Sequence, residues 1–144
     1  RGFLGFDYHY TTGSGKNQSH HSFSCVLLSS GVPLKELFIR PEGFFDKITE
    51  FFGYDDIDFE SAEFSRAFYV KAPEKRWAYD VLHARAIEFL LNQPKFTIQF
   101  APDCALARKS RTFRPEEFAQ AAEVLRGLLD GLPNYVLQQQ GGAT

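Results

Sequence analysis

The strongest constraint on the fold is a pair of alternating runs separated by one polar segment. In each run, aromatic or apolar side chains recur at every second position, which is typical of a strand with one buried face. The segment between them, residues 11–19, is polar and contains glycine, which favours a long exposed hairpin connection. The alternating positions are Leu4, Phe6, Tyr8 and Tyr10 in the first run and His21, Phe23, Cys25 and Leu27 in the second. The chain therefore begins with a predicted antiparallel hairpin.

Further elements follow at short intervals. A strand is expected at residues 37–40, a helix at 44–52, and strand structure over 56–60 and through Phe64, Phe68 and Val70. The remaining elements are a helix at 73–91 with a break at 83–84, a second hairpin at 96–109, and a helix from Pro115 to Leu132. Because most strands come in hairpin pairs, this order predicts an α+β fold, mainly antiparallel sheet built from hairpins with about three helices packed on it.

The length of 144 residues fits one domain with its own hydrophobic core. We assign residues 1–137 to a single soluble domain and predict a disordered, low-complexity tail at 138–144. The sixteen phenylalanines favour a sheet-rich core, since aromatic side chains suit pleated surfaces. A net charge of -2 gives no electrostatic support to a nucleic-acid partner, so none is expected.

The cellular setting is inferred from the cysteines and the chain start. Cys25 and Cys104 lie far apart without a CxxC motif, which fits a reducing compartment and favours the cytoplasm. No segment has the length and apolarity of a membrane span or a signal peptide. The chain starts at Arg1 without methionine and already resembles a strand by Phe3, so we expect a fragment of a longer protein.

Two histidines of the first hairpin form the candidate metal site. If Tyr10 pairs with His20, then His9 lies opposite His21 on one face, close enough to share a metal ion. No third ligand is evident, since Asp7 shares the His9 face but lies two residues along the strand. The alternative interpretation places both histidines as ordinary surface or half-buried strand residues.

Other patterns approach functional motifs without matching them. Residues 13–16, GSGK, lack the spacing of a phosphate-binding loop and lead into a strand, so a flexible hairpin tip is expected. The acidic residues at 55–63 fit a solvated strand face better than a calcium loop. The basic run at 108–114 could meet anionic lipid headgroups, although ordinary solvation also explains it. Without a GxSxG, HExxH, CxxC or GxGxxG motif, we predict no catalytic residue and no cofactor.

A phenylalanine-rich helix at residues 44–52 supplies the candidate partner surface. Its apolar side chains recur at helical spacing until Gly53. If these rings exceed what the core can bury, Phe45 and Phe52 form an exposed patch that binds a partner.

Three segments carry a resemblance to a known family. They are FDYHYTTGSGK at residues 6–16, LFIRPEGFFDKITEFFG at 37–53 and IDFESAEFSRAFYVKAPEKRWAYDVLHARAIEFLL at 57–91. They resemble an uncharacterised bacterial family, a domain of unknown function that follows one or more N-terminal membrane segments. The chain departs from that pattern at Ala84, where a helix-starting proline is expected, and at Arg114, where a capping aspartate is expected.

The resemblance implies a membrane-tethered bacterial protein of which this is the soluble part. Combined with the cysteine usage, it favours the cytoplasmic face of the membrane and a protein or lipid partner there. It transfers no catalytic residue, because none is established for the family. We therefore expect a non-enzymatic binding module, with a metal-dependent or ligand-sensing activity at His9 and His21 as the alternative.

Overall fold

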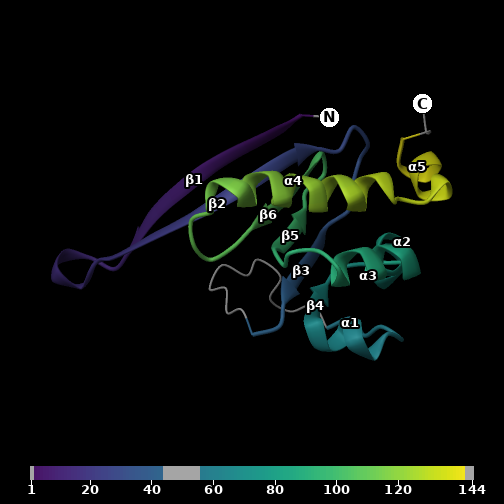
Figure 1. Cartoon of the computed structure of the whole chain (residues 1–144), viewed down its shortest axis with the longest axis horizontal. Coiled ribbons are helices and arrows are strands. Elements are labelled where there is room, and N and C mark those ends of the chain that lie inside the picture. The colour runs from purple at the N-terminus through teal and green to yellow at the C-terminus, as the bar shows by residue number, and fades with distance from the viewer. Residues whose placement is uncertain (1, 44–55, 142–144) are drawn as a thin grey trace.

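The computed structural model describes residues 2–43 and 56–141 and contains one six-stranded antiparallel sheet (Figure 1). The strands are β1 (Phe3–Thr12), β2 (Ser19–Ser29), β3 (Leu37–Pro41), β4 (Phe68–Lys71), β5 (Thr97–Phe100) and β6 (Cys104–Arg108). Their order across the sheet is β1-β2-β6-β5-β3-β4, and every neighbouring pair is antiparallel. The predicted α+β class with a sheet built from hairpins is confirmed.

The helices pack beside and over the sheet. They are the short 3-10 helix η1 (Gly15–Asn17) and the α-helices α1 (Ala62–Ala67), α2 (Lys75–Val81), α3 (Ala84–Leu91), α4 (Pro115–Asp130) and α5 (Asn134–Gly141). The longest, α4, packs on β2 and β6. The predicted helix at 44–52, with Phe45 and Phe52, lies outside the described residues.

The core forms on one face of the sheet, where apolar residues line up across the strands. One row runs through five strands in register and consists of Val26, Ala107, Ile98, Ile39 and Val70. All five side chains are buried, in the same cluster as the inner face of α4. The period-two alternation of the sequence therefore marks a sheet with one face against helices.

The predicted break at 83–84 separates α2 from α3. The His83 side chain caps α3, because its Nδ1 accepts a hydrogen bond from the Ala86 amide at 3.4 Å. Its Nε2 lies 2.7 Å from the carbonyl oxygen of Gly131, at the end of α4. A histidine cap therefore starts this helix at Ala84 without the proline that was expected there.

One predicted strand is a helix. Phe64 and Phe68 are four residues apart, a spacing that fits one face of a strand and one face of a helix equally well. Ser61 settles the choice, because its side chain accepts a hydrogen bond from the Phe64 amide and caps α1. Strand β4 starts only at Phe68, and residues 56–60 belong to no strand, so the expected acidic strand face does not form.

The predicted disorder of the tail is wrong for residues 138–141, which continue α5. The sequence of this helix is largely polar, and contacts with the rest of the fold stabilise it. Val136 is buried in the core, and the hydroxyl of Tyr135 donates a hydrogen bond to Asp80 at 2.8 Å. Burial of a few apolar groups thus orders a segment with weak helical patterning of its own.

Candidate functional site

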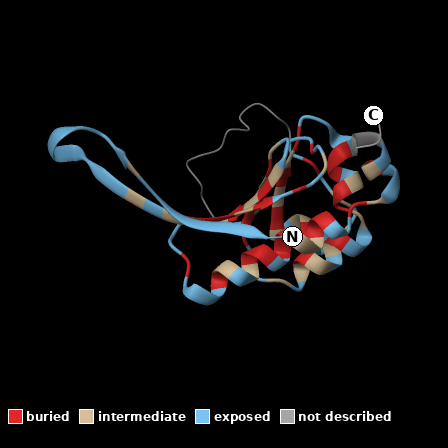
Figure 2. Cartoon of the chain, turned by 90° about the horizontal axis from the view of Figure 1, so that it is seen from above, coloured by how far each residue is buried: buried red, intermediate tan, exposed pale blue. Residues whose placement is uncertain are grey.

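The first hairpin projects far beyond the sheet. Strand β2 pairs with β6 only over Cys25–Ser29, whereas its pairing with β1 continues out to Thr12 and Ser19. Residues 7–24 therefore form a two-stranded ribbon, here called the arm, which extends away from the body (Figure 2). An isolated two-stranded ribbon is marginally stable in water, so the arm is a candidate for contact with another surface.

Strand β1 is the exposed edge of the sheet. Among residues 2–43 and 56–141 it pairs only with β2, and large apolar side chains along it face solvent: Phe3 is 43% exposed, Leu4 59%, Phe6 36% and Tyr8 48%. The strand contains no lysine and no proline, and its pairing register runs without a bulge. Natural edge strands are normally protected by such devices or by charged side chains. The one charged side chain of β1, Asp7, is hydrogen-bonded to Ser24, so this ten-residue edge has little protection and is a candidate for pairing with another strand.

Aromatic side chains stiffen the arm on one face. Tyr10 and His21 stack with ring centroids 4.7 Å apart, and Tyr8 lies 5.2 Å from Phe23 across the same two strands. The guanidinium of Arg108 lies 5.9 Å from the Phe23 ring at the base of the arm. These cross-strand pairs contribute to the stability of the ribbon.

The structure separates the two candidate metal ligands. His9 lies opposite Ser22, and His21 lies opposite Tyr10, one residue away from the register in which the histidines meet. Because a one-residue slip moves a side chain to the other face, the two imidazoles point to opposite sides of the ribbon. Nδ1 of His9 is hydrogen-bonded to the Ser22 hydroxyl. No group of three potential metal ligands occurs among residues 2–43 and 56–141.

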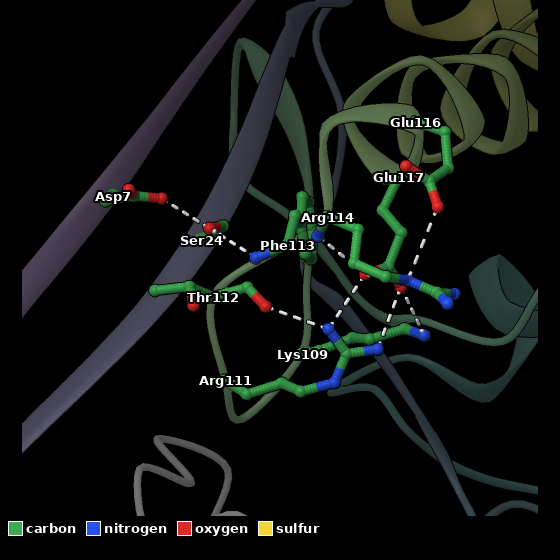
Figure 3. Close-up of polar contacts among 9 residues, drawn as sticks. All are labelled: Asp7, Ser24, Lys109, Arg111, Thr112, Phe113, Arg114, Glu116 and Glu117. Atoms are coloured by element: carbon green, nitrogen blue, oxygen red, sulfur yellow. Dashed lines mark hydrogen bonds and ion pairs between the residues drawn. The ribbon is translucent and has the colours of Figure 1, made fainter.

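A buried serine anchors the base of the arm (Figure 3). The Ser24 hydroxyl donates to the Asp7 carboxylate of β1 and accepts a hydrogen bond from the Phe113 amide at 2.7 Å. The Ser24 amide donates to the carbonyl of Arg111 at 3.2 Å. Both strands of the arm are thus tied to the loop before α4.

The basic run at 108–114 surrounds one buried carboxylate, that of Glu117 (Figure 3). Lys109 lies 2.8 Å from Oε2, and Arg111 donates to both oxygens at 2.8 and 2.9 Å. Oε1 also accepts from the backbone amide of Arg114 at 2.8 Å, which caps α4 without the expected aspartate. The hydrogen bonds from Arg111, followed by those from Lys109 and the Arg114 amide, hold the pKa of Glu117 well below its usual range.

A second candidate site is a pocket of about 1000 Å³ between residues 58–63 and helices α2 and α3. The rings of Phe59 and Tyr79 line it edge-to-face, with centroids 5.3 Å apart. Ser65 fixes the Phe59 backbone through its amide and carbonyl, and the Tyr79 hydroxyl donates to the Asp58 carbonyl at 2.9 Å. Four carboxylates, Asp58, Glu60, Glu63 and Glu88, also line the pocket, and none of them forms an ion pair with a described residue.

The free thiols offer no comparable chemistry. Cys25 is buried in β2, and burial raises its pKa to about 11, so it is a protonated, shielded group at neutral pH. Desolvation and the neighbouring Asp103 also raise the pKa of Cys104. Both side chains therefore lack the thiolate character of a nucleophile.

Comparison with protein-family models, curated proteins and solved structures found no match for this chain. In the part of the chain that the structure describes, no helix has the length and hydropathy needed to cross a membrane. The functional argument therefore rests on the edge strand, the arm and the pocket.

The sequence pointed to other residues than these. Phe45 and Phe52 fall outside the described ranges, and most of the exposed large apolar side chains that the structure does describe lie on β1. A signal for the edge was present in the sequence, because the even positions of the first run are apolar over a strand longer than the sheet needs. Which strand ends at the edge depends on pairing that the chain order does not reveal.

Proposed function

We propose that this domain is a non-enzymatic binding module of a membrane-tethered bacterial protein, and that it binds a protein partner along the edge strand β1. The observation that carries the proposal is the long edge strand β1, ten residues without lysine, proline or bulge and with four large apolar side chains in solvent. The tether and the cytoplasmic side are drawn from the family resemblance and the cysteine usage.

Strand addition is the binding mode that suits this edge. An extended partner segment satisfies the free backbone donors and acceptors of β1, while alternate side chains of the segment meet the exposed rings. The anchored base of the arm favours binding, because a pre-ordered strand loses little conformational entropy when a partner joins it.

A protein partner fits better than a lipid surface. The end of the arm, residues 13–18, is polar, so no ring there would enter the membrane interface. Part of the basic run is engaged within the domain, since Lys109 and Arg111 form ion pairs with the buried Glu117. The metal hypothesis has no geometric support in the observed register.

The test places a photo-crosslinking amino acid at position 8 or at position 135 of the protein in its native cells. Tyr8 and Tyr135 are both 48% exposed, so they sample two surfaces with equal access. We expect a protein adduct from position 8 and none from position 135, identified by mass spectrometry. A Phe6→Lys change in the chain with the position-8 probe should reduce the yield of the cross-linked adduct, because a lysine on an edge strand disfavours pairing with another strand. Equal adducts from both positions would contradict the proposal.

The acidic pocket supports a second candidate function, the binding of an organic cation. Carboxylates without an ion-pair partner attract a positive charge, and the faces of Phe59 and Tyr79 stabilise a cation through their π electrons. Titration with tetraethylammonium followed by NMR should shift resonances of Tyr79 and Ile87, and Glu88→Gln should weaken the effect. Glu74→Gln, an exposed carboxylate outside the pocket, is the matched control. Shifts that are spread evenly over the surface would exclude a site.

A further inference from the structure

We propose that the edge strand binds the edge strand of a second copy of this chain, antiparallel, about a two-fold axis that passes through Tyr8. This inference rests on the proposed function and names the partner of the same edge. The two sheets would join into one continuous sheet, with the core faces of both copies on the same side.

The charges of β1 select the position of the axis. A two-fold axis perpendicular to the sheet sets one residue opposite itself, and in the middle of β1 that residue is Asp7, Tyr8 or His9. An axis at Asp7 would place two carboxylates directly opposite each other, which is unfavourable. An axis at His9 would place two histidines opposite each other and would leave Asp7 opposite Thr11, without an opposite charge. An axis at Tyr8 places each Asp7 opposite His9 of the second copy and pairs residues 4–12, nearly the whole strand.

The polar pair has the hydrogen-bonding groups that this register needs. In the tautomer in which the Ser22 hydroxyl donates to Nδ1 of His9, the ring proton lies on Nε2. That Nε2–H can donate to the Asp7 carboxylate of the second copy. Asp7 already accepts from Ser24 with one oxygen, Oδ1, so Oδ2 is the acceptor for the new bond.

The aromatic face is complementary in the same register. Tyr8 lies opposite Tyr8 of the second copy, and the exposed Phe6 lies opposite the half-buried Tyr10, so aromatic rings meet across the axis. Cross-strand aromatic pairs are among the favourable contacts of antiparallel sheets. The pairing would bring neighbours from the second copy beside Leu4, Phe6 and Tyr8, three of the exposed apolar side chains of β1.

The pairing also explains the arm. The outer half of β1, residues 8–12, belongs to a ribbon of only two strands, whereas the inner half continues the six-stranded sheet. About the Tyr8 axis, the outer half of each copy lies along the inner half of the other. Each projecting ribbon thereby gains a third strand from the body of its partner, which two-stranded ribbons need for stability.

Cysteine cross-linking tests the register. In a Cys104→Ser background, Tyr8→Cys should form a disulfide-linked dimer under mild oxidation. The reason is that residue 8 of one copy lies directly opposite residue 8 of the other. Tyr10→Cys alone should form no linked dimer, because residue 10 of the second copy lies four residues away along the strand, beyond the reach of a disulfide. Mixing Phe6→Cys with Tyr10→Cys should restore the linked dimer. Cys25 is buried and does not compete.

Sedimentation equilibrium tests the charge argument without cysteines. His9→Asp, which sets two carboxylates opposite each other twice in the dimer, should raise the dimer dissociation constant about fivefold or more. His20→Asp is the matched control, because His20 lies on β2, away from the pairing edge. A chain that stays monomeric up to millimolar concentration, or a dimer that links through Tyr10→Cys alone, would overturn the inference.

The result is distinguishable from failure of the proposed function. If the chain is monomeric but the position-8 probe still captures a different protein, the edge recruits a partner that is not a second copy. If neither dimer nor adduct forms, the edge has no binding role and both proposals fall.

Discussion

Glu117 gives the basic run at 108–114 a structural meaning. A carboxylate that is 1% exposed must be compensated, and two cationic side chains and a backbone amide converge on it. The loop after β6 is thereby tied to the first turn of α4, next to the Ser24 anchor of the arm. A surface-solvation interpretation of the run is therefore incomplete for Lys109 and Arg111.

We expect Glu117→Gln to lower the free energy of unfolding by about 2 kcal/mol, since it weakens several charge-assisted hydrogen bonds in a buried position. Glu116→Gln, an exposed neighbour, should change it by less than about 0.5 kcal/mol. Urea unfolding of both variants provides the comparison.

The same residue predicts a pH dependence. The folded pKa of Glu117 is lowered below its unfolded value, so its stabilisation is present above the unfolded pKa and is lost as the pH falls toward the folded one. The stability gap between the native chain and Glu117→Gln should therefore shrink below about pH 4. A gap that does not change with pH would show that the carboxylate is not ionised in the fold.

Among the helices and strands, local sequence periodicity determines the type of secondary structure in some segments and leaves it ambiguous in others. The second hairpin, β5 and β6, and the helix α4 lie where periodicity predicted them, because each carries an unambiguous repeat of apolar residues. The strand prediction was wrong for residues 62–67, which form α1, and right for 68–71, which form β4, because Phe64 and Phe68 satisfy both repeats. The deciding group is the Ser61 cap, which strengthens a six-residue helix that propensity alone would not stabilise.

Packing of α3 on α4 depends on Gly127. A Cβ built at this position would lie 2.2 Å from Cζ of Phe89, so the glycine lets the two helices approach closely. Gly127→Ala should lower the free energy of unfolding by about 1–2 kcal/mol through overpacking, despite its better helix propensity.

A double-mutant cycle isolates that contact. In a Phe89→Ala background the clash is absent, so Gly127→Ala should become stabilising by up to about 1 kcal/mol through helix propensity. If Gly127→Ala lowered the free energy of unfolding equally in both backgrounds, the destabilisation would not come from a clash with the Phe89 ring.

At the scale of the whole molecule, the unusual feature is the division between a compact body and a projecting arm (Figure 2). The body buries one face of the sheet under helices, whereas the arm consists of two strands joined through the short helix η1 and pairs with no third described strand. The two longest strands of the sheet extend into this arm, which gives the chain a surface suited to a partner. The family resemblance and the tether stay predictions.

The sequence by itself determined the fold class, the one-sided sheet and the position of most elements, because these follow from local periodicity and capping residues. Only the tertiary structure decided the register of the first hairpin, the edge position of β1 and the pairing of Lys109 and Arg111 with Glu117. A one-residue shift exchanges the faces of a strand at no cost to the local pattern, so His9 and His21 could be placed together from sequence and lie apart in the fold. Contacts between residues distant in sequence fix such choices, and the local pattern holds no information about them.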